Sequence, residues 1–325
     1  MCTAVSYRTN QHYFGRTLDL EYSYCESVTI TPRDYPISFR HLPPSENHYA
    51  IIGMAYVVEN YPLYYDASNE KGLSIAGLRF QGNACYHPVE QGKDNVTPFE
   101  LVLWILSQCE TVVQARELLK NVNIVDESFC PELPASPLHW IIADKDRAIT
   151  VESVKDGLKV YDNPVGVLTN NPPFEMQMFN LNHYGHVTAR EPENHFSKKL
   201  ELNRYSRGMG GLGLPGDMSS MSRFVRASFL NLNGVSEGTE EENVSQFFHM
   251  MDNVAQIRGS VLTEDGKYEL TVYTSCCNTQ RGIYYYTTYE NRGITGVDLY
   301  QEKLDGVKLI SYPLKKEPQV LMQNG

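Results

Sequence analysis

Met1-Cys2-Thr3-Ala4-Val5 opens the chain, and its second residue directs the interpretation of everything that follows. Because Cys2 has a small side chain, removal of Met1 is plausible. Cys2 would then become the amino terminus. A terminal cysteine has a thiol with a pKa near ~8.5 and an α-amine with a pKa near ~7.7–8.0, so one residue supplies both a nucleophile and its base. Such a residue can attack an amide or ester carbonyl. Because many cysteines are simply buried, the remaining sequence has to support this hypothesis.

The composition indicates one large folded domain. The 325 residues are 42% hydrophobic and include 22 tyrosines, and no shift in composition divides them, so we expect a single domain over 1–325. A net charge of −11 without a basic stripe argues against nucleic acid and anionic membranes as partners. The chain has no apolar signal-peptide core, and no run approaches the ~18–20 apolar residues of a membrane span. We therefore expect a cytoplasmic protein.

Seven cysteines are scattered along the chain, at positions 2, 25, 85, 109, 130, 276 and 277. Zinc and redox sites need close pairs at fixed spacing, whereas the adjacent pair Cys276-Cys277 is typical of a strand. We expect no metal and no cofactor. A reducing compartment would also keep the thiol of Cys2 free.

Alternating apolar and polar residues predict strands over most of the chain. They cover 3–7, 13–20, 27–32, 49–58, 73–78, 138–144, 148–153, 157–161, 268–275, 282–289, 295–300 and 307–312. Short polar turns such as Asp144-Lys145-Asp146-Arg147 separate several of them. This pattern favours antiparallel meanders over parallel strands joined by helices.

A first pair of helices interrupts these strands. Thr97-Pro98-Phe99-Glu100 combines a capping residue, a first-turn proline and a capping-box glutamate. Thr111 with Gln114 repeats the capping pattern for a helix that ends at Leu119. We expect these neighbours to form one helical layer.

A second pair of helices is expected from Ser220 to Leu230 and from about Asn243. The outline is α+β, with two sheets face to face and helices outside. Residues 186–217 have no clear period and are predicted to form a long loop, a candidate assembly element. The tail 314–325 is expected to be disordered.

Five short motifs lie at strand ends and a helix start on this outline. They are Cys2, Arg16-Thr17-Leu18-Asp19, Gly77-Leu78-Arg79-Phe80, Leu168-Thr169-Asn170-Asn171-Pro172 and Ser222-Arg223-Phe224. Further segments follow the same order: Asn69-Glu70-Lys71-Gly72-Leu73, Leu138-His139-Trp140, Gly213-Leu214-Pro215-Gly216-Asp217, Asn253-Val254-Ala255, Arg258-Gly259-Ser260 and Tyr273-Thr274-Ser275-Cys276. Together they resemble the choloylglycine hydrolase family, the bile salt hydrolases and penicillin V acylases within the N-terminal nucleophile hydrolases. The resemblance covers nearly the whole chain. It implies an αββα four-layer sandwich of two antiparallel sheets between helix pairs, a homotetramer and a gut bacterium as the source.

The resemblance implies catalytic roles for five residues. Cys2 would be the nucleophile, and its freed amine would take the thiol proton and later serve the leaving amine. Arg16 would lie beside the thiol and favour thiolate, and Asp19 would orient the α-amine by accepting a hydrogen bond. Asn170 would donate its side-chain amide to the oxyanion. Arg223 would support the electrostatics and geometry of the site.

Position 79 departs from the family pattern, because bile salt hydrolases usually have Asn there and penicillin acylases Tyr. If the backbone N–H of Arg79 is the oxyanion donor, the oxyanion hole survives the change. The side chain could reach an anionic substrate tail or narrow the pocket.

Conjugated bile salts are the implied substrates, each with a rigid apolar sterol and an anionic glycine or taurine end. Leu20 and the tyrosines Tyr61, Tyr64 and Tyr65 fall where family members place substrate contacts, and aromatic walls suit a sterol face. Any one tyrosine could equally be ordinary core. Arg207 resembles variants associated with taurine preference, and we expect it to meet the sulfonate, across a subunit boundary.

Three functions remain open on the sequence alone. The first is hydrolysis of glycine- or taurine-conjugated bile salts through a Cys2 thioester, with acyl transfer to another amine as a side activity. The second is a penicillin V or N-acyl-homoserine lactone acylase, against which Arg79 in place of Tyr counts mildly. The third is a non-catalytic sterol-binding protein. The intact set of Cys2, Arg16, Asp19 and Asn170 counts against it.

Overall fold

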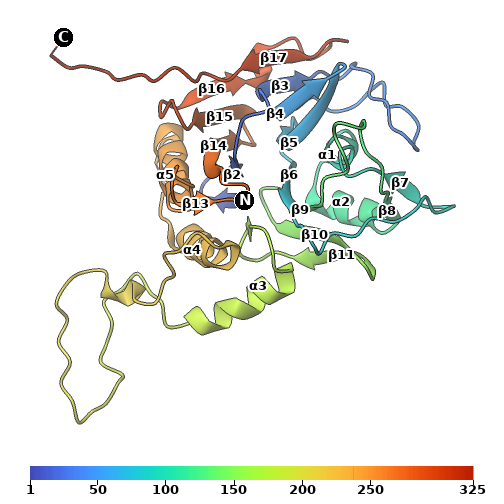
Figure 1. The fold of residues 1–325 in the computed structure, drawn as a ribbon. Helices are drawn as coiled ribbons and strands as arrows, with labels where there is room; N and C mark the ends of the chain where they lie inside the picture. Colours follow the sequence, from blue (N-terminus) through green and yellow to red (C-terminus); the bar gives the residue numbers. More distant parts are fainter. Residues whose placement is uncertain (237, 325) are drawn as a thin grey trace.

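Two antiparallel sheets pack face to face in the computed structural model, which describes residues 1–236 and 238–324 (Figure 1). The first sheet runs in the order β12 (Val167–Leu168), β1 (Cys2–Arg8), β2 (His12–Leu20), β14 (Tyr268–Asn278), β15 (Ile283–Thr288) and β16 (Thr295–Asp298), and β13 (Val261–Leu262) pairs with β14. The second runs β11 (Gly157–Asp162), β10 (Ala148–Val154), β9 (Leu138–Ala143), β6 (Ser74–Arg79), β5 (Tyr61–Asn69), β4 (Ile51–Val58), β3 (Ser27–Thr31) and β17 (Ile310–Pro313). The short strands β7 (Asp94–Val96) and β8 (Val122–Ile124) pair in parallel beside them.

Helices cover the outer face of each sheet. The helices α4 (Ser220–Asn233) and α5 (Glu240–Asp252) pack on β1, β2, β12 and β14, whereas α1 (Leu101–Leu106) packs on β5 and β6, with α2 (Val112–Leu119) in the same hydrophobic cluster (Figure 1). A separate cluster joins the inner faces of both sheets to α4 and α5. The predicted α+β sandwich of two antiparallel sheets between helix pairs is confirmed.

The helix starts were predicted with mixed success, and α1 was placed too early. The Thr111 hydroxyl caps α2 by accepting from the Gln114 N–H, as expected. At α1, the Glu100 carboxylate accepts from the Thr97 N–H at 3.1 Å, but the Thr97 hydroxyl has no partner. Only half of the capping box forms, so regular helix begins at Leu101.

Two other helices correct the sequence analysis. α5 begins at Glu240 rather than near Asn243, because Thr239 and Glu242 form the full capping box. α3 (Phe174–Asn180) was not predicted, since its N-cap Pro173 offers no capping side chain. The 3₁₀ turns η1 (Leu181–Tyr184), η2 (Met209–Gly211) and η3 (Leu299–Gln301) complete the elements.

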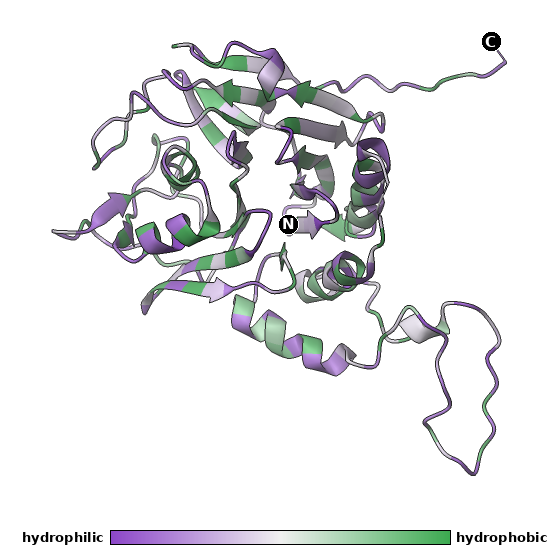
Figure 2. Ribbon diagram, turned by 180° about the vertical axis from the view of Figure 1, so that it is seen from behind, coloured by the Kyte–Doolittle hydropathy of each residue, from purple (hydrophilic) through white to green (hydrophobic). Residues whose placement is uncertain are grey.

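Two segments leave the body of the molecule. Residues 186–208 form no helix or strand and project outward as the yellow segment of Figure 1, and Figure 2 shows them as mostly hydrophilic. Residues 317–324 extend past β17, whereas Leu314 packs against the inner cluster and Lys315 is hydrogen-bonded to Tyr286 and Thr288, so the start of the expected disordered tail is held on the body. Gly325 lies outside the described residues. Across the described part of the chain, every helix is too short or too polar to cross a membrane.

Candidate active site

The β1–β2 hairpin brings three of the predicted residues together. Cys2 pairs with Leu18 and Ala4 with Arg16, and residues paired across strands share one face of a sheet. Cys2 and Arg16 therefore both face the second sheet. Side chains alternate along a strand, so Asp19 lies on the opposite face, toward α4 and α5. Cys2 is 4% exposed and Asp19 is fully buried.

Arg16 is fixed between the two sheets. Its guanidinium donates to the backbone carbonyl oxygens of Tyr65 at 3.0 Å and Gly77 at 2.5 Å, both in the second sheet. Burial opposes its charge, but the field of Cys2, and then of Tyr273 and other buried acids, raises the pKa of Arg16. A cation is thereby held beside the thiol of Cys2.

The Asp19 carboxylate is held by two hydroxyl groups. The Thr271 hydroxyl donates to Oδ1 at 2.6 Å and the Thr17 hydroxyl to Oδ2 at 3.2 Å. Thr271 lies opposite Asp19 in the neighbouring strand β14. Sequence analysis missed Thr271, because a threonine in a strand gives no signal of its partner.

Asn170 and Arg223 meet the backbone of Cys2 from two further segments. The Cys2 N–H donates to Asn170 Oδ1 at 2.8 Å, and Arg223 donates to the same oxygen at 2.8 Å. Arg223 also donates to the Cys2 carbonyl at 2.5 Å and to the Thr3 hydroxyl at 2.6 Å. It comes from the start of α4, where the Ser219 hydroxyl caps the helix. Burial lowers the pKa of Arg223.

Arg79 contributes its backbone to this cluster. Its carbonyl oxygen accepts from Asn170 Nδ2 at 2.8 Å. The neighbouring Phe80 N–H donates to Pro137, while the N–H of Leu138, which lies opposite Arg79, donates to Tyr86. Arg79 and Leu138 are therefore a non-hydrogen-bonded pair, and the Arg79 N–H and C=O both point away from β9. The N–H is directed to the side on which Asn170 lies.

The predicted substrate residues Leu20, Tyr61, Tyr64 and Tyr65 divide between the two hydrophobic clusters. Leu20 and Tyr65 pack against the inner cluster, on the side of Cys2. Tyr61 and Tyr64 pack instead in the outer cluster beneath α1. A register shift between Met54 and Ala55 breaks the simple alternation of β5. The structure therefore does not bring Tyr61 and Tyr64 to the candidate site.

Arg207 is also remote from Cys2 within this chain. It is exposed, just before η2 in the segment that projects from the body (Figure 1). A single copy of the chain does not bring the Arg207 guanidinium to the site. The length of the loop was readable from the sequence, but its direction was not.

Met1 extends the pairing of β1. Its ammonium donates to the Asp19 carbonyl at 2.7 Å and forms an ion pair with Glu269. Burial lowers the pKa of the Met1 ammonium, while the negative charge of Asp19 opposes that shift. The next nitrogen along the chain, that of Cys2, donates to Asn170 Oδ1.

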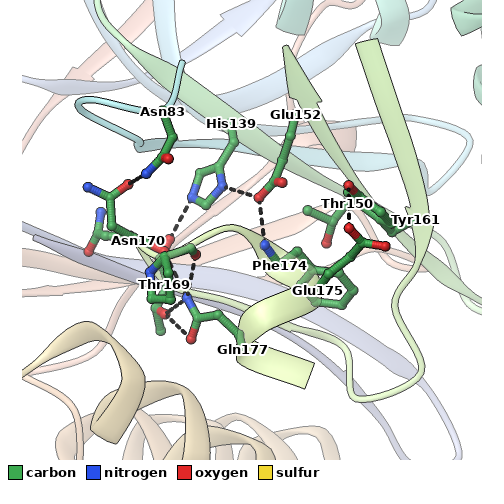
Figure 3. Close-up of polar contacts among 12 residues, drawn as sticks. Asn83, His139, Thr150, Glu152, Tyr161, Thr169, Asn170, Phe174, Glu175 and Gln177 are labelled. Carbon is green, nitrogen blue, oxygen red and sulfur yellow. Dashed lines mark hydrogen bonds and ion pairs between the residues drawn. The ribbon is translucent and has the colours of Figure 1, made fainter. Parts of the chain in front are cut away.

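Sequence analysis also missed a buried polar pair behind Asn170. Figure 3 shows His139 between Glu152 and Thr169, close to Asn170. His139 and Glu152 are 0% and 1% exposed. The sequence signal was a titratable residue within each predicted strand, between apolar neighbours at Leu138-His139-Trp140 and after an apolar one at Val151-Glu152-Ser153.

A cysteine at the start of an inner strand, between two face-to-face antiparallel sheets enclosed by helices, defines the class of N-terminal nucleophile hydrolases. Residues 2–312 match the linear amide C–N hydrolases, choloylglycine hydrolase family, and the chain belongs to this family.

The relatives cover the whole chain. A bile salt hydrolase/transferase from Lactiplantibacillus plantarum is 55% identical over 324 residues, which is 100% of both chains. A conjugated bile acid hydrolase from Lactobacillus gasseri is 39% identical over 96% of this chain and 100% of the relative. The solved structure of a mutant conjugated bile acid hydrolase from Clostridium perfringens matches with a TM-score of 0.92, at 36% identity and 100% coverage of both chains. Penicillin V acylase from Agrobacterium tumefaciens shares the fold, with a TM-score of 0.77 at 19% identity over 97% and 92% of the two chains.

Proposed function

We propose that this protein hydrolyses the amide bond of glycine- or taurine-conjugated bile salts, releasing the free bile acid and the amino acid. One observation carries the proposal. Cys2 is contacted by Asn170 and Arg223, which come from distant segments, in a chain 55% identical to a bile salt hydrolase/transferase. We place the reaction in the cytoplasm, where reducing conditions keep the thiol free.

Acylation begins after Met1 is removed. The α-amine of Cys2 takes the proton from Sγ, and Sγ attacks the amide carbon of the substrate. Arg16 favours the thiolate because its fixed positive charge lies beside the sulfur. When the C–N bond breaks, the protonated amine gives its proton to the leaving nitrogen, and a thioester remains on Cys2. Asp19 keeps the amine oriented through this transfer.

Two N–H groups are proposed to bind the oxyanion that forms in each step. Asn170 Nδ2 carries two N–H donors, one of which bonds the Arg79 carbonyl. We assign the second donor, together with the backbone N–H of Arg79, to the oxyanion. Because position 79 contributes its backbone, an arginine there keeps the oxyanion hole intact. Arg223 holds the Asn170 side chain through Oδ1.

Deacylation repeats these steps with water. The α-amine removes a proton from water, the hydroxyl oxygen attacks the thioester carbon, and the C–S bond breaks to return Cys2 to its starting state. An amine in place of water would give a new amide. Relatives named hydrolase/transferase support this acyl transfer as a side activity of the same thioester.

The two ends of the substrate need different surroundings. Leu20 and Tyr65, on the inner face, are proposed to contact the apolar sterol. The exposed Arg79 side chain is proposed to meet the anionic end. Arg207 could reach that end only in another copy of the chain, within the proposed homotetramer. Arg207→Ala should therefore lower the ratio of taurine to glycine release, and an unchanged ratio would remove Arg207 from the site.

The direct test is a product assay. Purified protein, with the loss of Met1 checked by intact mass, is incubated with taurocholate, glycocholate and penicillin V, beside a Cys2→Ala control. We expect taurine and glycine to be released and the control to be at least about 10⁴-fold slower. Dominant release of 6-aminopenicillanic acid would make the protein an acylase of another class. No release from protein with a free Cys2 would contradict catalysis.

A further inference from the structure

His139 on β9 connects two strands and the Asn170 segment. Its Nε2 lies 2.8 Å from the Thr169 carbonyl oxygen, and its Nδ1 lies 3.0 Å from Glu152 Oε1 (Figure 3). The same carboxylate oxygen accepts from the Phe174 N–H at 3.0 Å. His139 and Glu152 thus form hydrogen bonds with the two ends of residues 169–174, the segment that contains Asn170.

The partners fix how the imidazole is protonated. A carbonyl oxygen can only accept, so Nε2 must carry a hydrogen and donate to Thr169. Nδ1 and Glu152 then share one further proton. Oε1 also accepts from the Phe174 N–H, so the carboxyl group of Glu152 links His139 to the start of α3.

Within residues 169–174, both backbone hydrogen-bonding groups of Asn170 have partners. The Asn170 N–H donates to the Ser220 hydroxyl at 2.8 Å, and its carbonyl accepts from Gln177 at 2.8 Å. Its side chain is therefore presented toward Cys2 from a segment fixed to β9, β10 and α4.

The ring of His139 also supports the second proposed oxyanion donor. Phe80, the residue after Arg79, stacks on the imidazole with ring centroids 4.2 Å apart and an interplanar angle of 5°. One histidine therefore contacts the chain next to Asn170 on one side and next to Arg79 on the other.

We propose that His139 and Glu152 are positioning residues that hold Asn170 and the Arg79 N–H in register for the oxyanion. This inference rests on the proposed function, because it assigns a role only through those two donors. A displacement of the donors by about 1 Å would cost on the order of 10²-fold in rate. Leu20 and Tyr65, the proposed sterol contacts, are expected to be unaffected.

A double-mutant cycle tests the proposal. His139→Gln, Asn170→Ala and the double variant are compared by kcat and KM for taurocholate. We expect His139→Gln to lower kcat by about 10- to 100-fold with little change in KM. The double variant should be slower than Asn170→Ala alone by a much smaller factor than His139→Gln costs by itself, because the Asn170 donor is already gone and only the Arg79 N–H remains to be displaced. Glu152→Gln, which keeps a similar shape and can still accept from Phe174, should lose less than His139→Gln.

The matched control is His12→Gln. His12 is also a buried histidine, 1% exposed, but it bonds hydroxyl groups at the far end of β2. The His12→Gln variant should keep the wild-type kcat. When it is combined with Asn170→Ala, the free-energy effects of the two substitutions on kcat should add. Wild-type kcat in both folded His139→Gln and Glu152→Gln, or effects of His139 and Asn170 that multiply, would overturn the positioning role. Wild-type kcat in Asn170→Ala would instead contradict the proposed function, and this inference with it.

Discussion

The two ends of the β1–β2 hairpin are both buried and polar, yet they differ in charge. At the open end, Cys2 lies among Arg16, Asp19 and Arg223, all less than 9% exposed. At the turn end, His12 bonds the Ser6 and Thr279 hydroxyls at 2.9 Å each.

Burial, with a smaller effect of Arg8, lowers the pKa of His12 to about 3, so the buried imidazole at the turn end stays neutral near pH 7. Buried charge costs stability, and buried neutral hydrogen bonds cost much less. The buried charges are therefore concentrated at the open end of the hairpin, where the proposed reaction requires them. Substitutions at the open end should therefore change the rate, and substitutions at the turn end should change stability.

The largest effect should come from Asp19→Asn. This change removes the charge next to the terminal nitrogen but leaves an oxygen that can accept from Thr271 or Thr17. By analogy with other catalytic triads, we expect kcat to fall by about 10³- to 10⁴-fold. Melting temperature is measured beside kcat. A loss of melting temperature that accounts for the lost activity would make Asp19 a structural residue.

Asn170→Ala should have the next largest effect. Loss of one oxyanion donor costs about 10²- to 10³-fold in kcat in other enzymes. The variant also removes the acceptor of the Arg223 and Cys2 donors, so the loss should lie at the upper end. Single-turnover rates with taurocholate measure it. A change confined to KM would contradict a role in the transition state.

His12 gives a pH dependence that is specific to the turn end. Its pKa in the folded protein, about 3, lies below the unfolded value of ~6.5, so below pH 6.5 the unfolded state binds a proton that the folded state does not. The stability that neutral His12 contributes to the folded state is fully present above pH 6.5 and is lost as the pH falls toward 3. Between pH 7 and pH 5 it should lower the free energy of unfolding by about 2 kcal/mol.

Urea unfolding of wild-type and His12→Gln protein at pH 7 and pH 5 isolates this contribution. The variant should lose less stability than the wild type over that interval. Equal losses in the two proteins would show that His12 is not the group responsible.

The smallest effects are expected from removing one hydroxyl group at each end of the β1–β2 hairpin, and they should distinguish the two ends most clearly. Ser6→Ala removes a hydroxyl bonded to His12, and Thr3→Val removes one bonded to Arg223. Each should cost about 1 kcal/mol of stability in urea unfolding. Only Thr3→Val should lower kcat, because only Arg223 reaches Asn170. Equal kcat in the two variants would remove the functional distinction between the ends of the hairpin.

The sequence predicted the fold better than it predicted side-chain directions. Alternation and capping patterns located most strands and the start of α2, because these depend on neighbouring residues. Tyr61 and Tyr64 were predicted to form a substrate wall, but both pack in the outer cluster that contains α1. The register shift beside Ala55 also interrupts the simple alternation of β5. A shift of register depends on the partner strand, which local sequence does not reveal.

The candidate site was predictable only in part. The resemblance indicated Cys2 and Asn170, and in the structure the Cys2 N–H donates to Asn170 Oδ1 at 2.8 Å. His139 and Glu152 lay in the sequence as polar residues within apolar strands. Their contact depends on the pairing of β9 with β10 and on the path of residues 169–174. Tertiary packing fixes both of these features.

The proposed mechanism requires that the α-amine of Cys2 be free. A cleavable amino-terminal tag that leaves Cys2 as the first residue after cleavage tests it directly, with taurine release from taurocholate measured before and after cleavage. The thiol is present in both forms, and only the amine changes. The account predicts no release from the tagged protein and full activity once intact mass shows Cys2 at the amino terminus. Equal rates before and after cleavage would contradict it.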